Sequence, residues 1–408
     1  MTQNAGTQRI VVIGGGFAGL WAAAAAAARA RELFGLDAGA LDIALVAPDP
    51  FHTIRVRCYE DDLAAIRLPL DDLLAPMGVT RIEAAVTAID PAARTLATGA
   101  GPLAYDRLIL AAGSALRVPD IPRAQPTFDV DSYAGAERLA AHLAALASGP
   151  RDAAAHAAVV IGGGLAGVEI ACELPGRLRT LLGAGAPVRV VLVDHGEIGA
   201  AMGAGAHTVR SALAAAGVEA RDHSGVASVE ADGVRLADGT MIPARTVIFT
   251  TGARASPLAG QLGVPLDRLG RVAVDAFLKV EGVAAVYAAG DCAVAAADNL
   301  GHVTVMSCQH ARPMGRLAGH NAVCDLAGRP QDRVAFSAPD YVTVTDLGPE
   351  GAVYTSGWDR GTLVASGAAA KTVKQTINCS RIYPPVPATK EALFAAAAPV
   401  LQAPPATR

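Results

Sequence analysis

The chain has 408 residues, of which 52% are hydrophobic and 18% charged, and its formal net charge is −4. This length predicts two or three domains, and the composition predicts a globular protein with ample buried core. The small negative charge, the lack of a long Lys/Arg run and the 4% aromatic content argue against a nucleic-acid-binding protein.

Near the N-terminus an apolar strand runs directly into a glycine turn and an alanine-rich helix. Residues 10–20 read IVVIGGGFAGL, with Gly14, Gly16 and Gly19 at the spacing of a dinucleotide-binding turn. Gly14 permits the tight turn, Gly16 lets the backbone approach a pyrophosphate, and Gly19 lets the helix lie close to the strand. The phosphates would bind free N–H groups at the helix N-terminus. We expect a strand over 9–13, a helix over 18–33 and a parallel strand over 41–47.

This turn has a near copy at residues 159–168, VVIGGGLAGV, with Gly162, Gly164 and Gly167 in the same places. The strand expected after it, 188–194, ends in Asp194. A carboxylate there can accept both ribose hydroxyls of an adenosine and would repel a 2′-phosphate, which favours NADH over NADPH. The matching position in the first copy is Ala47, so Asp49 is the candidate for holding the adenosine there.

The order of elements also repeats. The first copy is followed by expected strands at 86–89, 95–97 and 107–112, which lead to Gly113, and the second by strands at 226–231, 234–236 and 246–251, which lead to Gly252. Prolines at 119, 122 and 126 and the Ser-Gly-Pro at 148–150 mark crossings between the two units. Residues 270–280 read as a further strand. The repetition predicts two homologous dinucleotide-binding domains.

Six cysteines are scattered along the chain, with no CxxC and no zinc-ligand spacing: Cys58, Cys172, Cys292, Cys308, Cys324 and Cys379. We expect buried thiols in a reducing compartment, no disulfide redox pair and no metal site. The uncharged stretch 11–28 could be mistaken for a signal peptide or a membrane span, but its glycines have turn spacing. We therefore expect a cytoplasmic protein with no integral membrane segment.

Several motifs in order resemble one family. They are GGGFAG at 14–19, FH at 51–52, ILAAG at 109–113, GGGLAGVE at 162–169, IFTTG at 248–252 and VYAAGD at 286–291. This set resembles the pyridine nucleotide-disulfide oxidoreductase flavoproteins, and among them most the type II NADH dehydrogenases.

The resemblance implies an α/β fold of two Rossmann-like dinucleotide-binding domains, arranged as in glutathione reductase, plus a small α+β C-terminal domain. It implies an FAD-binding domain formed by residues 8–122 and 254–325, and an NAD(P)H-binding domain at 123–253. Residues 326–408 would cover the flavin and serve an interface, which is compatible with a homodimer.

The candidate site residues fall into three sets. The FAD set is Gly14, Gly16, Phe17, Ala18, Gly19, Asp49, Arg57, Ala112, Gly113, Gly290 and Asp291, and the NADH set is Gly162, Gly164, Gly167, Asp194 and Gly252. The catalytic set is Glu169, expected in the first turn of its helix and beside the nicotinamide, Gln309, and His310 as a proton donor. Gln309 matches the first of two glutamines at the family's quinone site, but the paired positions here read Pro313 and Met314.

The sequence has no nucleophile, metal or paired-carboxylate pattern, which is compatible with hydride transfer. We expect an enzyme that passes a hydride from NADH to FAD and then electrons to a quinone or another small molecule. One alternative is a reductase of a small redox protein, and another is a flavin- and NADH-binding redox sensor with little turnover. A third is a first domain that has lost its flavin site, as suggested by Ala47.

Overall fold

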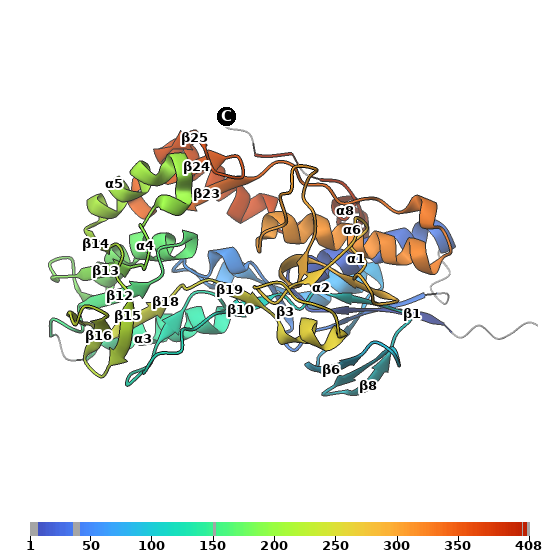
Figure 1. The fold of residues 1–408 in the computed structure, drawn as a ribbon, viewed down its shortest axis with the longest axis horizontal. Helices are drawn as coiled ribbons and strands as arrows, with labels where there is room; N and C mark the ends of the chain where they lie inside the picture. Colours follow the sequence, from blue (N-terminus) through green and yellow to red (C-terminus); the bar gives the residue numbers. More distant parts are fainter. Residues whose placement is uncertain (1–6, 36–40, 150–151, 402, 406–408) are drawn as a thin grey trace, which may run out of the picture.

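The computed structural model describes residues 7–35, 41–149, 152–401 and 403–405. Two units, each built on a five-stranded sheet, lie side by side, and the C-terminal part extends across both (Figure 1). Pro150, in the Ser-Gly-Pro that is predicted to mark a crossing, lies outside the described residues, and Gln8 opens the first strand.

The first unit contains an all-parallel sheet with strand order β21-β9-β1-β2-β5. Its strands are β1 (Gln8–Ile13), β2 (Leu41–Val46), β5 (Thr80–Ile82), β9 (Arg107–Leu110) and β21 (Val286–Ala288). An antiparallel meander of β6 (Val86–Asp90), β7 (Thr95–Thr98) and β8 (Gly101–Ala104) precedes β9. Between β2 and β5 lie the hairpin of β3 (Phe51–Thr53) and β4 (Arg67–Pro69) and the short helix α2 (Leu70–Leu74).

The second unit repeats this arrangement with the parallel order β11-β18-β12-β13-β14. These strands are β11 (Phe128–Asp129), β12 (Ala157–Ile161), β13 (Arg189–Val193), β14 (Val218–Arg221) and β18 (Thr246–Phe249). Its helices are α3 (Tyr133–Ala147), α4 (Leu165–Leu182) and α5 (Ala206–Ala216), and its meander is β15 (Val226–Glu230), β16 (Gly233–Leu236) and β17 (Met241–Pro243). The predicted duplication is therefore present in the fold.

The chain crosses between the units twice, and the two crossings pair with each other. β10 (Ser114–Leu116) leads out of the first unit and pairs antiparallel with β19 (Ala253–Ala255), which leads back. The returning segment then supplies β21 to the first sheet. We propose the boundaries 8–122 with 254–325, 123–253 and 326–408 for the three domains.

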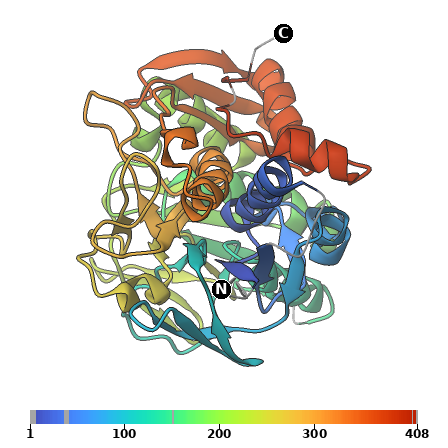
Figure 2. The same ribbon diagram turned by 90° about the vertical axis from the view of Figure 1, so that its right-hand side faces the viewer.

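Helix α1 (Phe17–Phe34) is buried on all sides over its first half, because it lies between the first sheet and helix α6 (Cys308–Leu326). Figure 2 shows α1 in blue beside α6 in orange. A Cβ on Gly315 would lie 2.2 Å from the carbonyl oxygen of Ala18, and one on Gly319 would lie 2.1 Å from that of Ala22. Small residues on both helices thus permit a close contact that larger side chains would prevent.

The C-terminal part contacts both units. Strands β23 (Val342–Asp346), β24 (Ala352–Ser356) and β25 (Thr362–Ser366) pack with helix α7 (Gly367–Thr376) over α4 and α5 of the second unit. A π-helical turn, Ile377–Arg381, follows α7, and α8 (Lys390–Ala396) packs on α1 of the first unit. The C-terminal part thus contains both strands and helices, as the predicted α+β domain would, and it bridges the two units.

One predicted strand is wrong. Residues 270–280 form only the two-residue strand β20 (Val272–Ala273), which pairs with β22 (Ala293–Val294). The rest is a turn, because the Asp275 carboxylate accepts hydrogen bonds from the backbone N–H groups of Phe277 and Lys279, and Leu278 has a left-handed φ of 67°. Side-chain bonding of this kind competes with strand pairing.

Candidate functional site

The first glycine turn is a narrow connection between β1 and α1. Gly14 has a φ of +108°, and a Cβ on Gly19 would lie 1.8 Å from the carbonyl oxygen of Gly14. Nothing lies within 4 Å of the Cβ position of Gly16, the N-cap residue, and in the described chain no side chain caps this helix. Free N–H groups and open space at a helix N-terminus suit a pyrophosphate. The turn therefore fits a bound dinucleotide.

The predicted Gly290-Asp291 turn packs directly on this helix N-terminus. Gly290 has a φ of +71°, and a Cβ there would lie 2.8 Å from the Cβ of Ala18. The Asp291 carboxylate accepts a hydrogen bond of 2.6 Å from the Ser114 hydroxyl. Asp291 is one residue past the start of a 3-10 turn whose N-cap is Ala289, so it does not cap that turn. The fold thus brings together Ala18, Ser114 and Asp291, which are far apart in the sequence.

Of the two neighbouring arginines, Arg55 and not Arg57 contacts this cluster. The Arg55 guanidinium donates to the Asp131 carboxylate at 2.5 Å and to the Ser114 hydroxyl at 3.0 Å, and lies 3.7 Å from Asp291. Arg57, the predicted cofactor residue, instead donates to Glu60 and to the Tyr383 hydroxyl, both at 2.6 Å. The structure gives Arg57 a contact with the C-terminal part, and its role in cofactor binding stays a prediction.

At the adenosine end of this site the side chains differ from the expected pattern. Ala47 lies next to Gly15, whose Cβ position is 3.5 Å from the Ala47 methyl group. Asp49 is further along the loop and forms an ion pair of 2.5 Å with Arg67. His52 is fully buried, with Nδ1 2.9 Å from the carbonyl oxygen of Gly15, and burial lowers its pKa to about 4. This ring therefore supports the turn as a neutral imidazole, and it meets the Phe17 ring edge-on.

The second glycine turn has the same geometry. Gly162 has a φ of +115°, a Cβ on Gly167 would lie 1.8 Å from the carbonyl oxygen of Gly162, and the Cβ position of Gly164 is open. Asp194 follows β13, and its carboxylate accepts hydrogen bonds from the N–H groups of Gly163 at 2.6 Å and Gly196 at 2.7 Å. It thus lies against the turn at the position that Ala47 has in the first copy.

The remaining predicted backbone residues lie where the chain passes between the units. Gly113 and Gly252 both have left-handed φ values, +70° and +85°. The carbonyl oxygen of Gly113 accepts hydrogen bonds from the Ser256 N–H and the Cys292 thiol, and that of Gly252 accepts one from the Arg117 N–H. Ala112, just before Gly113, packs partly buried against the core of the first unit.

Glu169 lies in the second turn of α4, so the prediction that it lies in the first turn is wrong. Its carboxylate accepts hydrogen bonds from the Lys374 ammonium at 2.6 Å and from the Asp346 N–H at 3.1 Å. Both side chains of the Glu169–Lys374 pair are 9% exposed. Burial raises the pKa of Glu169, and the ammonium group opposes that shift. Lys371 and Tyr59 bind Asp346 beside this pair.

Gln309 and His310 lie in the first turn of α6. The Gln309 amide donates to the carbonyl oxygen of Asp340 at 3.1 Å. His310 is buried against the rings of Tyr341 and Trp358, and its Nδ1 accepts a hydrogen bond of 3.0 Å from the Val305 N–H. Burial lowers the pKa of His310 to about 4, so at neutral pH it has no imidazolium proton to donate. Because Nδ1 accepts a hydrogen bond, the neutral ring carries its proton on Nε2. The role of His310 as proton donor stays a prediction and would use this proton.

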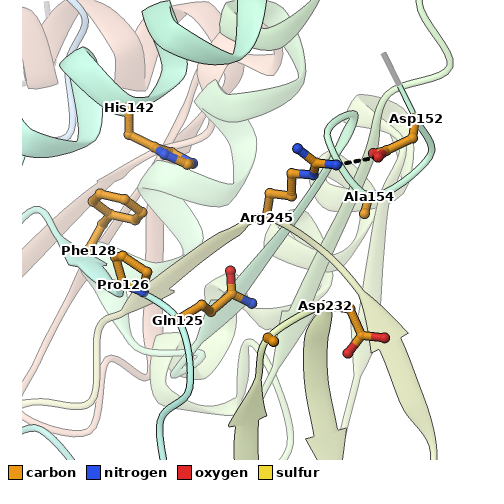
Figure 3. Close-up of a pocket in the computed structure, with 9 residues that line it drawn as sticks. Gln125, Pro126, Phe128, His142, Asp152, Ala154, Asp232 and Arg245 are labelled. Carbon is orange, nitrogen blue, oxygen red and sulfur yellow. Dashed lines mark hydrogen bonds and ion pairs between the residues drawn. The ribbon is translucent and has the colours of Figure 1, made fainter. Parts of the chain in front are cut away.

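A hollow of about 400 Å³ in the second unit lies away from the glycine turn (Figure 3). His142 and Phe128 stack along one side, while Arg245 points to Asp152 and pairs with it. Arg245 and Ala154 precede β18 and β12, so this hollow is at the amino ends of the parallel strands. Dinucleotides bind at the carboxyl ends of such sheets. The hollow is therefore separate from the candidate site.

Comparison with known proteins agrees with this geometry. A family model described as pyridine nucleotide-disulphide oxidoreductase matches residues 8–315. The chain belongs to this family. It is 52% identical over 400 residues to the NADH dehydrogenase-like protein Rv1812c of Mycobacterium tuberculosis strain ATCC 25618 / H37Rv, covering 97% of this chain and 99% of that protein. It is 28% identical over 341 residues to the demethylphylloquinone reductase NdbB of Synechocystis, covering 79% and 80% of the two chains.

Solved structures share the fold at low sequence identity. The NDH2 structure from Plasmodium falciparum in complex with NADH has a TM-score of 0.75 at 12% identity, covering 96% of this chain and 97% of that one. The sulfide:quinone oxidoreductase of Aquifex aeolicus has a TM-score of 0.75 at 20% identity, covering 95% and 93%. Both predictions of class are confirmed: the fold is a two-domain α/β dinucleotide-binding fold, and the chain is a flavoprotein oxidoreductase that uses a nicotinamide nucleotide.

The pairing of the cysteines and the length and hydropathy of the helices can be compared with the predictions. All six cysteines are described, and none is paired with another. None of the helices in the described ranges is both long enough and apolar enough to cross a bilayer. The described cysteines therefore form no disulfide with one another.

Sequence reasoning missed four residues that the structure brings to these sites: Ser114, Asp131, Asp346 and Lys374. Ser114 follows a predicted glycine and could have been included by its position. Lys374 is 205 positions from Glu169, and no spacing in the sequence links the two. A buried acid needs a cation to balance its charge, so a search for such a cation was the one way to find Lys374 from the sequence.

Proposed function

We propose that this protein is an FAD-dependent NADH oxidoreductase whose acceptor is a quinone or a similar small molecule. The observation that carries the proposal is the pair of open glycine turns, each at an uncapped helix N-terminus among the described residues, within one chain. Two such turns suit two dinucleotides. The bound flavin would supply two-electron chemistry between a nicotinamide and an acceptor.

The first turn is assigned to FAD because the returning segment closes over it. Ala18, Ser114 and Asp291 meet there, and the Asp291 carboxylate, held by the Ser114 hydroxyl and Arg55, is placed to accept hydrogen bonds from a ribityl chain or ribose. This arrangement comes from three separate stretches of sequence and suits a cofactor that stays bound.

The second turn is assigned to NADH because of Asp194. Its carboxylate lies against the turn and would repel a 2′-phosphate while accepting ribose hydroxyls. Glu169 follows the same turn on α4, and its carboxylate is held in a fixed position by Lys374; its place beside the nicotinamide is part of this proposal. The chain's contribution is alignment of the two rings and exclusion of water from between them.

The quinone acceptor has independent support. The absence of a cysteine pair disfavours a disulfide substrate, and one relative is named a demethylphylloquinone reductase. Pro313 and Met314 replace the second glutamine expected at a quinone site, so the quinone's contacts would differ from those of type II NADH dehydrogenases. The homodimer stays a prediction that light scattering would test.

A matched pair of variants tests both assignments. Neither Gly16→Ala nor Gly164→Ala meets a protein atom within 4 Å, so both variants should fold. We expect Gly16→Ala to lose flavin on gel filtration, and Gly164→Ala to keep it but raise the KM for NADH about tenfold or more, because each methyl group occupies the space of a pyrophosphate. Equal flavin content and equal KM in both variants would contradict the proposal.

The acceptor is tested by anaerobic mixing of the wild-type protein with NADH, followed by a soluble quinone analogue. Bleaching of the oxidised-flavin absorption band and its recovery on adding quinone are expected. Bleaching without recovery would reject the quinone and favour a protein acceptor. Slow bleaching with a change in oligomeric state would favour a redox sensor, and a colourless protein that stays free of FAD would favour a lost flavin site.

A further inference from the structure

One guanidinium group joins the two dinucleotide-binding units close to Asp291. Arg55 lies in a 3-10 turn between β3 and β4 of the first unit. Its Nε donates to the backbone oxygen of Asp131 at 2.7 Å, and a terminal nitrogen donates to the Asp131 carboxylate at 2.5 Å. Asp131 lies between β11 and α3 of the second unit. Two nitrogens of one side chain thus bind one residue across the boundary, and we call this the inter-unit contact.

The other terminal nitrogen of Arg55 faces the first unit. It donates to the carbonyl oxygen of Ser114 at 3.2 Å and to its hydroxyl at 3.0 Å, and it lies 3.7 Å from the Asp291 carboxylate. Ser114 opens β10, which lies with β19 between the two sheets (Figure 1). Its hydroxyl donates to Asp291, and the preceding Gly290 packs on Ala18 at the first glycine turn. Polar contacts therefore run from that turn through Arg55 to the second unit.

The second-unit end of the inter-unit contact is held by its own neighbours. The Asp131 N–H donates to the Asp129 carboxylate at 3.1 Å, and this carboxylate also accepts bonds from Ser132. Ser132 is the N-cap of α3 and accepts a hydrogen bond from the Gly135 N–H. Helix α3 packs on α4, the helix that begins at the second glycine turn. A displacement of the second unit would therefore displace Asp131 as well.

The two units have other contacts that remain when the inter-unit contact is removed. In the same β3–β4 hairpin, the Arg67 guanidinium lies 4.2 Å from the centre of the Tyr133 ring on α3. The side chains of Arg55 and Asp131 are 32% and 24% exposed, so water reaches either one when its partner is lost. Loss of one partner therefore avoids the penalty of a fully buried charge. We expect such variants to fold and the second unit to change its position.

From these contacts we propose that Arg55 is a positioning residue that sets the angle at which the second unit meets the first. The inference rests on the proposed function, because it takes the first glycine turn to hold FAD and the second to hold NADH. Hydride transfer needs its two reacting atoms within about 3.5 Å, and a displacement of about 1 Å can lower its rate about a hundredfold. Arg55 thus acts on the transfer step, whereas the affinity for NADH is set within the second unit.

The deciding variant is Asp131→Ala, because it removes the carboxylate in the second unit and leaves Ser114 and Asp291 in place. We expect the rate of flavin reduction at saturating NADH, measured by anaerobic stopped flow, to fall about tenfold or more. The Kd for NADH should stay within about twofold of wild type. Reduction of the same flavin by dithionite, which needs no bound nucleotide, should be unchanged. Arg55→Gln should slow reduction by NADH at least as much, and the double variant no more than Arg55→Gln alone, because both changes remove one contact.

The matched control is Arg138→Gln. Arg138 on α3 pairs with Asp129 at 3.1 Å, so this change breaks an arginine–aspartate pair that lies wholly within the second unit. The control should reduce flavin with NADH at the rate of wild type. A merely local disturbance near the start of α3 would slow it as well.

Trypsin cleavage gives a readout that does not depend on activity. Arg117 and Arg123 are exposed in the crossing from the first unit to the second. With the inter-unit contact removed, this crossing should open more often, because fewer contacts hold its two sides together. We therefore expect faster cleavage after these arginines in Asp131→Ala and Arg55→Gln, and cleavage at the wild-type rate in Arg138→Gln.

Three results would overturn the proposal: flavin reduction by NADH at the wild-type rate in Asp131→Ala, equal slowing in Arg138→Gln, or equal slowing of reduction by dithionite. If NADH does not reduce the flavin of wild type, the proposed function is rejected, and trypsin cleavage alone decides whether Arg55 holds the two units together. If Asp131→Ala fails to fold, Asp131→Asn takes its place, since it removes the charge and keeps an acceptor oxygen.

Discussion

The buried Glu169–Lys374 pair joins the second unit to the C-terminal part, and acidification should relieve the loss of stability in one single variant of the pair but not in the other. Its two charged atoms are 2.6 Å apart, and both side chains are 9% exposed. Lys374→Met leaves the Glu169 carboxylate buried without a counter-ion, whereas Glu169→Gln leaves the Lys374 ammonium in that position. Each variant therefore tests the cost of one buried charge.

The cost of Lys374→Met is limited because Glu169 can take up a proton. The ordinary pKa of this carboxyl is 4.5, so holding it protonated costs about 3.4 kcal/mol at pH 7 and about 0.7 kcal/mol at pH 5, at about 1.36 kcal/mol per pH unit. The raised pKa in the folded variant means that the folded state binds the extra proton, so acidification relieves the deficit. Neutralising Lys374 in Glu169→Gln costs about 4.6 kcal/mol at pH 7, and acidification does not relieve it.

The assay is the free energy of unfolding of the two single variants, the double variant and wild type, from urea denaturation at pH 5, 6 and 7. We expect the Lys374→Met deficit to shrink by about 2.7 kcal/mol between pH 7 and pH 5, the Glu169→Gln deficit to persist, and the double variant to recover most of the loss. A Lys374→Met deficit that does not change with pH would refute the reasoning.

Three further predictions follow from the site. Asp194→Ala should raise the KM for NADH and lower the NADH/NADPH ratio of kcat/KM about tenfold; an unchanged ratio would reject the assignment of Asp194. The pKa values of His52 and His310 are lowered to about 4 in the folded state, so on acidification these histidines bind a proton in the unfolded state before they do so in the folded state. The free energy of unfolding should therefore fall by about 3 kcal/mol per histidine as the pH drops from 6.5 to 4. Urea denaturation at both pH values checks this. Gly167→Ala should lower Tm by several degrees, since its Cβ would lie 1.8 Å from a carbonyl oxygen, whereas Gly176→Ala on the same helix should leave Tm equal or higher; equal losses would contradict the steric argument.

The parts of the fold that sequence predicts well are those with short-range signals. Both glycine turns, the strands and helices around them and the repeated order of elements follow from glycine spacing and apolar runs, because these residues act on their own neighbours. Residues 270–280 mislead for the same reason. Their alternation is that of a strand, but the Asp275 side chain bonds to the backbone and forms a turn.

The parts of the site that sequence reasoning cannot supply are contacts between distant segments. Asp194 is placed by its own strand, and its position beside the second turn was predictable. Lys374 and Ser114 reach Glu169 and Asp291 only through the arrangement of the three parts of the chain. Arg55 and Arg57 are two residues apart with the same chemistry, and only the three-dimensional neighbours distinguish them.

The close fit of α1 on α6 has a consequence for synthesis of the chain. Ten successive residues of α1, Ala18–Ala27, are buried, and much of their cover is α6, which starts roughly 270 residues after α1 ends. At about 5–20 residues per second a ribosome needs roughly 15–55 s to add that length. During this time the nascent chain presents an apolar helix whose cover has not yet been made. We expect newly made first units to require chaperone protection until the ribosome has passed residue 326.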